Sequence, residues 1–144
     1  MPDETALYRR ILVPLDGSDE VDRAILGHVA RLAKFCGSEV ILLRVGQTQP
    51  WDVILREAEG MEAYLASKKA DLDDLGIPTR TVFVHGSPAD VILEQAEALD
   101  CDLIAMSTHG HGPVRDLLFG SVAAKVRHAA RVPVLLIRAS GQAE

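Results

Sequence analysis

Residues 10–18 read Arg-Ile-Leu-Val-Pro-Leu-Asp-Gly-Ser and carry the signals of a strand, a turn and a helix start in one short segment. The apolar run that ends at Leu15 has the length and composition of a buried β-strand. Asp16-Gly17 favours a turn, and Ser18 is a residue type that caps helix N-termini. A strand that leads through a tight turn into a helix predicts an α/β fold.

Short apolar runs alternate with longer helical patterns along the rest of the chain. Alternating strands and helices imply right-handed crossovers and a mostly parallel sheet. We therefore predict one domain over residues 1–144, a doubly wound five-stranded sheet with helices on both faces and loose tails at 1–8 and 139–144. The predicted strands are residues 10–15, 40–45, 81–84, 102–106 and 132–137, and the predicted helices begin after Ser18 and Pro50 and at Pro88 and Gly120.

Composition and charge argue against several classes of function. The net charge is −6 with scattered Lys and Arg, so the sequence lacks the basic patch of a nucleic-acid-binding surface. The apolar runs are too short to span a membrane, and residues 1–8 lack the apolar core of a signal peptide. Cys36 and Cys101 have no metal-like spacing, so we expect reduced structural cysteines. These features predict a cytoplasmic protein without nucleic-acid or membrane partners.

Asp16 lies where the first predicted strand ends. In a doubly wound sheet, ligands bind beyond the carboxyl ends of the strands, at the switch point beside strand 1. At that place Asp16 would meet a ribose hydroxyl or a metal-bound water. Asp16 would equally fit a turn in which its side chain bonds the amides near Ser18. The sequence favours the ligand role and leaves both open.

The segment 107–121, Ser-Thr-His-Gly-His-Gly-Pro-Val-Arg-Asp-Leu-Leu-Phe-Gly-Ser, is too long for a tight connection between a strand and a helix. Gly110 and Gly112 allow the backbone to turn tightly and to approach a ligand. A helix opening at Gly120-Ser121 would offer free amides and a favourable dipole to an anion. The segment is a candidate phosphate-binding loop, and an ordinary surface loop with turn glycines is the alternative.

His109 and His111 lie two residues apart in this segment. A zinc site would need further ligands at suitable spacing, and the sequence offers none beside them. We therefore favour histidines that support or cover a phosphate, with no metal bound by them. The Walker Gly-Lys-Ser/Thr signature is missing, which argues against a fast P-loop NTPase.

The last predicted strand, Val132–Ile137, is apolar and carries Pro133 near its start, which is typical of an edge strand. An exposed apolar edge invites pairing with another chain. Pairing with the same strand of a second copy would give a symmetric homodimer, and a covering helix is the alternative.

The segment 107–121 resembles the universal stress protein signature Gly-x2-Gly-x9-Gly-Ser/Thr, which marks the ATP-binding branch of that family. Gly110 and Gly120-Ser121 match its second and third parts, and Ser107 stands where the first glycine would be. Residues 10–18 and the ending from Gly120 to Ile137 are also typical of the family. The resemblance therefore spans nearly the whole chain.

This resemblance implies the strand order 3-2-1-4-5, a dimer through strand 5, and ATP bound with Mg²⁺ across strands 1 and 4. It implies that Pro14, Leu15, Asp16 and Val45 line the base and ribose side. It further implies Met106 and Ser107 between base and phosphates, and phosphates held by Gly110, Gly120, Ser121 and Val122, with His109, His111 and Gly112 in the same loop.

Three functions stay open on the sequence. The favoured one is a stress-response regulator in which ATP, or another adenine nucleotide, changes the loop 107–120 without rapid chemistry. The second is a slow Mg²⁺-dependent ATPase, with Asp16 or a histidine positioning water. The third is a dimerising interaction module that binds no nucleotide, and Ser107 in place of glycine is the feature in its favour.

Overall fold

The computed structural model describes residues 7–46, 51–109 and 113–139, without the side chains of residues 51–57, 109, 113–120 and 139. Strands and helices alternate throughout these residues, as predicted. The elements are β1 (Arg10–Pro14), α1 (Asp19–Cys36), β2 (Glu39–Gly46), α2 (Trp51–Asp74), β3 (Thr79–His85), α3 (Pro88–Ala98), β4 (Leu103–His109), α4 (Pro113–Ala129) and β5 (Val134–Ala139).

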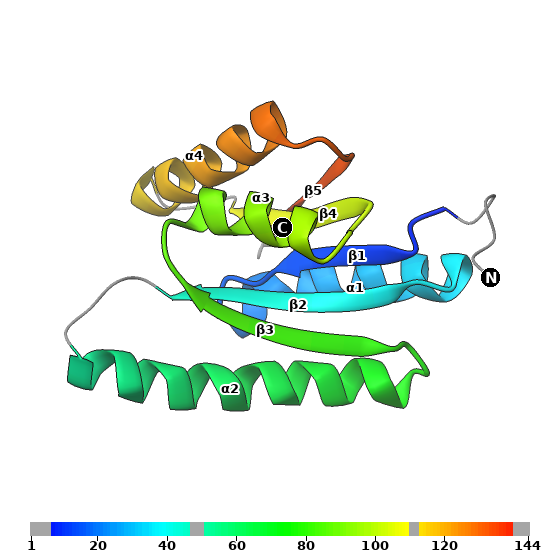
Figure 1. The fold of residues 1–144 in the computed structure, drawn as a ribbon, viewed down its shortest axis with the longest axis horizontal. Helices are drawn as coiled ribbons and strands as arrows, with labels where there is room; N and C mark the ends of the chain where they lie inside the picture. The colour runs from blue at the N-terminus through cyan, green and yellow to red at the C-terminus, as the bar shows by residue number, and fades with distance from the viewer. Residues whose placement is uncertain (1–6, 47–50, 110–112, 140–144) are drawn as a thin grey trace.

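All five strands form one parallel sheet in the order β3-β2-β1-β4-β5. The order and the doubly wound architecture confirm the prediction. Helices α1 and α2 cover one face of the sheet, and α3 and α4 cover the other (Figure 1). Because both faces are covered, the middle of a central strand is apolar on both sides: Ile11, Leu12 and Val13 of β1 are fully buried.

β4 and β5 extend past the carboxyl ends of the apolar runs from which they were predicted, and β2 and β3 extend by one or two residues at each end. β4 continues through Ser107, Thr108 and His109, which pair with β5 up to Ala139. A ladder is made by backbone groups, so polar residues can prolong a strand that an apolar pattern would end early. β5 begins at Val134, two residues later than predicted, and the carbonyl of Pro133 accepts a bond of 3.1 Å from the Ile104 amide.

The prediction for the start of the last helix is wrong. α4 begins at Pro113, so Gly120 and Ser121 lie about two turns inside the helix. Proline is favoured at the first position of a helix, because its missing N–H would have no partner there and its φ already suits a helix. In the sequence, Pro113 is therefore the signal for the start of α4, and Gly120 is not.

The N-cap prediction for Ser18 holds for its position but not for its bond. Ser18 precedes α1 with an extended backbone, and its side chain makes no capping hydrogen bond. Its carbonyl accepts the first helical bond, from the amide of Asp22 at 2.8 Å. No helix in the described ranges is long and apolar enough to cross a membrane.

Candidate functional site

The sheet opens between β1 and β4 toward the carboxyl ends of the strands. β1 and β4 pair only at Ile11–Leu103 and Leu12–Ile104. In contrast, β1 stays paired with β2 as far as Pro14, and β4 stays paired with β5 to its end. This is the point where the strand order reverses, so the opening has the position at which doubly wound folds bind ligands.

The β1–α1 turn, residues 15–18, forms one side of this opening and is held by a side chain that the sequence reasoning missed. The carboxylate of Asp22 accepts the amide of Asp16 at 2.8 Å and the amide of Gly17 at 2.9 Å. A carboxylate that binds two successive amides fixes the peptide planes of the turn. A side chain of α1, the helix that follows the turn, therefore holds the backbone of the turn.

Asp22 is only 1% exposed, which is unusual for an aspartate. Burial raises the pKa of its carboxyl group, while the hydrogen bonds from Tyr64 and from the amides of Asp16 and Gly17 act in the opposite direction. Desolvation outweighs these bonds, so the folded protein holds the Asp22 proton more tightly than an exposed aspartate would.

Tyr64 connects this carboxylate to the second helix. Its hydroxyl donates to Oδ2 of Asp22 at 2.5 Å. Burial and the neighbouring Asp22 carboxylate both raise the pKa of Tyr64, so the hydroxyl keeps its proton and acts as a donor. Three donors thus surround the buried carboxylate, and one of them comes from α2.

Gly17 is required by the geometry of the turn. Its φ of +91° is one that residues with a side chain rarely adopt. A Cβ at this position would also lie 2.9 Å from Nε of Arg44, whose guanidinium packs over the turn from β2. Asp22 therefore restrains the turn by hydrogen bonds, and Arg44 leaves no room for a side chain at Gly17.

The structure places Asp16 at the carboxyl end of β1, partly exposed beside the opening, as predicted. The alternative was that the Asp16 side chain itself bonds the amides of this turn. The amide of Asp16 is instead bonded to the carboxylate of Asp22. The ligand role of the Asp16 carboxylate stays a prediction.

Ser107 lies in extended β4 and is not among the residues with positive φ. Its side chain is 2% exposed, and its hydroxyl donates to the Val21 carbonyl in the first turn of α1 at 3.4 Å. The backbone at Ser107 therefore has a conformation that a residue with a side chain adopts without strain. Ser107 ties the end of β4 to the start of α1, across the switch point.

The remaining predicted residues of strands 1, 2 and 4 have buried side chains. Leu15 packs in the core beneath α1 and α2, whereas Val45 and Met106 pack in the core beneath α3 and α4. Pro14 is buried as well and ends β1. These residues lie near the carboxyl edge of the sheet, with side chains packed on its opposite faces.

The predicted phosphate-side residues are only partly described. Gly110, His111 and Gly112 lie outside the described residues, and His109 is the last residue of β4. Gly120, Ser121 and Val122 lie inside α4, where backbone amides are bonded within the helix. The reason given for an anion at Gly120-Ser121, a helix N-terminus, is therefore wrong. The free amides of α4 belong to its first turn, after Pro113.

A signal for Asp22 was present in the sequence. Residues 22, 25, 29 and 33 follow the helical spacing of the buried face of α1, and the other three are apolar. An acidic residue in such a stripe is costly unless it is bonded, so its presence indicates a local structural demand. The donors that meet it, from a turn and from α2, could not be read from the spacing.

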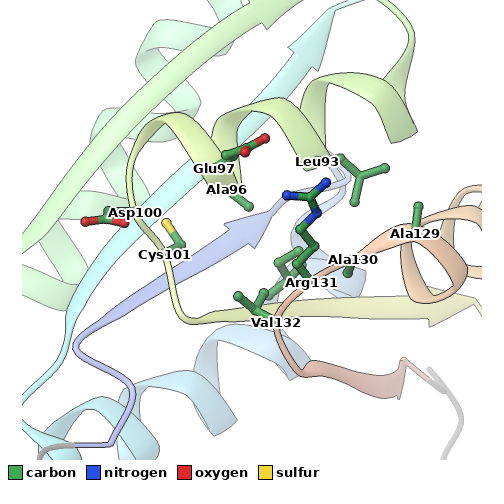
Figure 2. Close-up of a pocket in the computed structure, with 10 residues that line it drawn as sticks. Leu93, Ala96, Glu97, Asp100, Cys101, Ala129, Ala130, Arg131 and Val132 are labelled. Carbon is green, nitrogen blue, oxygen red and sulfur yellow. The ribbon is translucent and has the colours of Figure 1, made fainter.

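Two cavities in the described part of the chain lie away from this opening. One, of about 260 Å³, lies at the amino ends of the strands between α3 and the α4–β5 connection, with Cys101 and Arg131 in its wall (Figure 2). Burial raises the pKa of the Cys101 thiol to about 11, so this group is neutral at neutral pH. The other cavity lies between α1 and α2. Within the described residues, no group of three or more His, Cys, Asp or Glu side chains is arranged to hold a metal ion.

Comparisons with known proteins agree with this architecture. The profile of the Universal stress protein family matches residues 7–138. Universal stress protein MJ0531 of Methanocaldococcus jannaschii is 35% identical over 92% of this chain and 83% of its own length.

Two solved structures show the same fold. MJ0577, a universal stress protein of the same organism, has a TM-score of 0.81 at 29% identity, over 91% of this chain and 96% of that chain. A universal stress protein from Archaeoglobus fulgidus in complex with dAMP has a TM-score of 0.69 at 23% identity, over 90% of this chain and 98% of that one.

Proposed function

The chain belongs to the universal stress protein family, and on that premise we propose that it is a regulatory protein that binds an adenine nucleotide between the carboxyl ends of β1 and β4. The observation that carries the proposal is the opening of the sheet after the pairs Ile11–Leu103 and Leu12–Ile104. A nucleotide there would lie between the β1–α1 turn and the end of β4, at the switch point of the fold.

The charges beside the opening support one orientation of the nucleotide. The first turn of α1 carries Asp19 and Glu20, and Asp16 precedes it. Carboxylates accept hydrogen bonds from ribose hydroxyls and repel phosphates. The sugar therefore belongs on the β1–α1 side, with the Asp16 carboxylate as its acceptor.

The phosphates then belong on the β4–α4 side, which includes the predicted loop 107–121. The first turn of α4 supplies amides that the helix itself does not use, after Pro113. Bound Mg²⁺ would neutralise phosphate charge there. The fulgidus protein of the same fold, whose structure holds dAMP, supports an adenine nucleotide as the ligand class.

Calorimetric titration of nucleotide-stripped protein with Mg-ATP, AMP and GTP tests this proposal. We expect ATP or AMP to bind and GTP to bind weakly. Asp16→Ala should weaken binding about tenfold, since it removes a charge-assisted hydrogen bond. Glu20→Ala is the matched control, because Glu20 is an exposed acid in the adjacent turn, and its affinity should stay near that of the wild type.

Absence of heat and of thermal stabilisation with every nucleotide, in folded protein, would instead favour the interaction module. Equal losses in the two variants would show that Asp16 acts only through general charge. A turnover assay on the same samples separates a regulator from a slow hydrolase.

We propose further that two copies pair through β5. This strand is at the edge of the sheet and has β4 as its neighbour on one side. The Ile104 amide bonds to the Pro133 carbonyl, so in a regular parallel ladder the amides of Leu135 and Ile137 also face β4. The amide of Leu136 then faces outward, toward the place of a second copy.

Light scattering should therefore give twice the chain mass for the wild type at micromolar concentration. Leu136→Pro removes an outward amide and should yield a folded monomer, whereas Leu135→Pro should disrupt β5 itself. A wild type that is monomeric, or a dimer that survives Leu136→Pro with an unchanged dissociation constant, would exclude pairing through this edge.

A further inference from the structure

A buried hydrogen bond joins α2 to the turn of the proposed nucleotide site. Oδ1 of Asp22 accepts the Asp16 amide, and Oδ2 accepts both the Gly17 amide and the Tyr64 hydroxyl. The Tyr64 phenol therefore fixes the orientation of the Asp22 carboxylate. The carboxylate holds the backbone of residues 16–17. A carboxylate that is 1% exposed has little access to water, so its donors must come from the protein.

Resting on the proposed function, we propose that Asp22 and Tyr64 are positioning residues that hold the β1–α1 turn in its ligand-binding conformation. The affinity of the site for nucleotide, which includes the contribution of Asp16, then depends on how α2 packs against α1. Neither side chain needs to touch the nucleotide, because both act through the backbone of residues 16–17. The site would thus be controlled from a helix outside the β1–β4 opening.

A second contact between the same helices supplies a control. Lys68, one turn beyond Tyr64 on α2, binds the carboxylate of Asp19 at the start of α1. Asp19 also pairs with Arg23 and is half exposed. Lys68→Met therefore removes the ion pair with Asp19 and the ammonium that lies 5.3 Å from the centre of the Tyr64 ring, but it leaves the Tyr64 hydroxyl in place. Tyr64→Phe removes only the hydroxyl that bonds to Asp22.

The first test measures amide hydrogen exchange by NMR in nucleotide-free protein. Tyr64→Phe should speed exchange of the Asp16 and Gly17 amides about tenfold relative to core amides, since a hydrogen bond to a charged group is lost. Lys68→Met should leave these two amides at wild-type rates. Unchanged exchange in Tyr64→Phe, or equal acceleration in both variants, would overturn the positioning role.

The second test is Mg-ATP affinity by calorimetry. Tyr64→Phe should weaken binding about tenfold and Lys68→Met less than twofold. If the wild type binds no nucleotide, the proposed function fails, but the exchange experiment still decides whether Tyr64 holds the turn. Wild-type binding with equal affinity in Tyr64→Phe would overturn the link between α2 and the site.

The pH profile of affinity provides a readout that a merely structural role would not move. A protonated Asp22 carries an O–H on one oxygen and accepts the two amides less strongly than the carboxylate does, so affinity should fall as pH drops through its pKa. Tyr64 lowers that pKa by hydrogen bonding, so Tyr64→Phe should shift the acid limb to higher pH. Among the described residues, the other charged groups near Asp22, Tyr64 and the turn are Asp16, Asp19, Lys68 and Arg44, and all are retained in Tyr64→Phe. An acid limb that does not move relative to the wild type would contradict the proposal.

Discussion

Asp22→Ala is expected to lower the free energy of unfolding by about 3 kcal/mol, although the residue lies in the first turn of a helix. Truncation would leave the amides of Asp16 and Gly17 and the hydroxyl of Tyr64 without their acceptor. A buried donor without a partner costs about 1–3 kcal/mol, and partial entry of water reduces the sum. Urea denaturation monitored by circular dichroism measures the effect.

Asp19→Ala is the matched control for this prediction. Asp19 lies in the same first turn of α1 and pairs with Lys68 and Arg23, but it is half exposed. Ion pairs of exposed carboxylates contribute little, so this change should cost much less stability than Asp22→Ala. If the two alanine variants lose the same stability, then the Asp22 carboxylate does not hold the turn.

The difference between the wild type and Asp22→Ala should also depend on pH. Burial raises the folded-state pKa of Asp22 above its unfolded value. The contribution of this titration to stability is then fully present below the unfolded pKa and is lost as pH rises through the folded pKa. The stability advantage of the wild type over Asp22→Ala should therefore grow as the pH is lowered from neutral. An advantage that shrinks would reverse the sign of the pKa shift.

Met106→Ala should lower the free energy of unfolding by about 2–5 kcal/mol, because the side chain is 1% exposed and truncation leaves a cavity in the core beneath α3 and α4. Met106→Leu keeps the volume and should cost less than about 1.5 kcal/mol. Thermal and urea unfolding of the three proteins give these values.

The same pair of variants tests what Met106 does at the site. The resemblance to the family implies that this residue lies between base and phosphates, whereas the structure buries its side chain. If only its backbone faces the ligand, both variants should keep Mg-ATP affinity within about twofold under folding conditions. A large loss of affinity in Met106→Leu, with stability retained, would instead show that the side chain contacts the nucleotide.

The sequence by itself determined the fold class and, through the resemblance, the strand order. Apolar runs as clear as Ile11–Val13 have no other way to be buried than inside a sheet covered on both faces. The switch-point position of Asp16 followed from the same alternation. The boundaries of β4, β5 and α4 differ from the predicted ones. A strand can continue through polar residues, and a helix can begin at a proline inside an apparent loop.

Only the tertiary structure decided how the site is held. Asp22 appears in the sequence as one acid among several at the start of α1, and Tyr64 lies 42 residues further along the chain. Their bond arises because the sheet docks α1 and α2 on the same face, which brings the phenol to the carboxylate that binds the turn. Local spacing encodes which residues share a face. It does not encode which buried donors meet across elements, since that depends on how whole helices pack against the sheet.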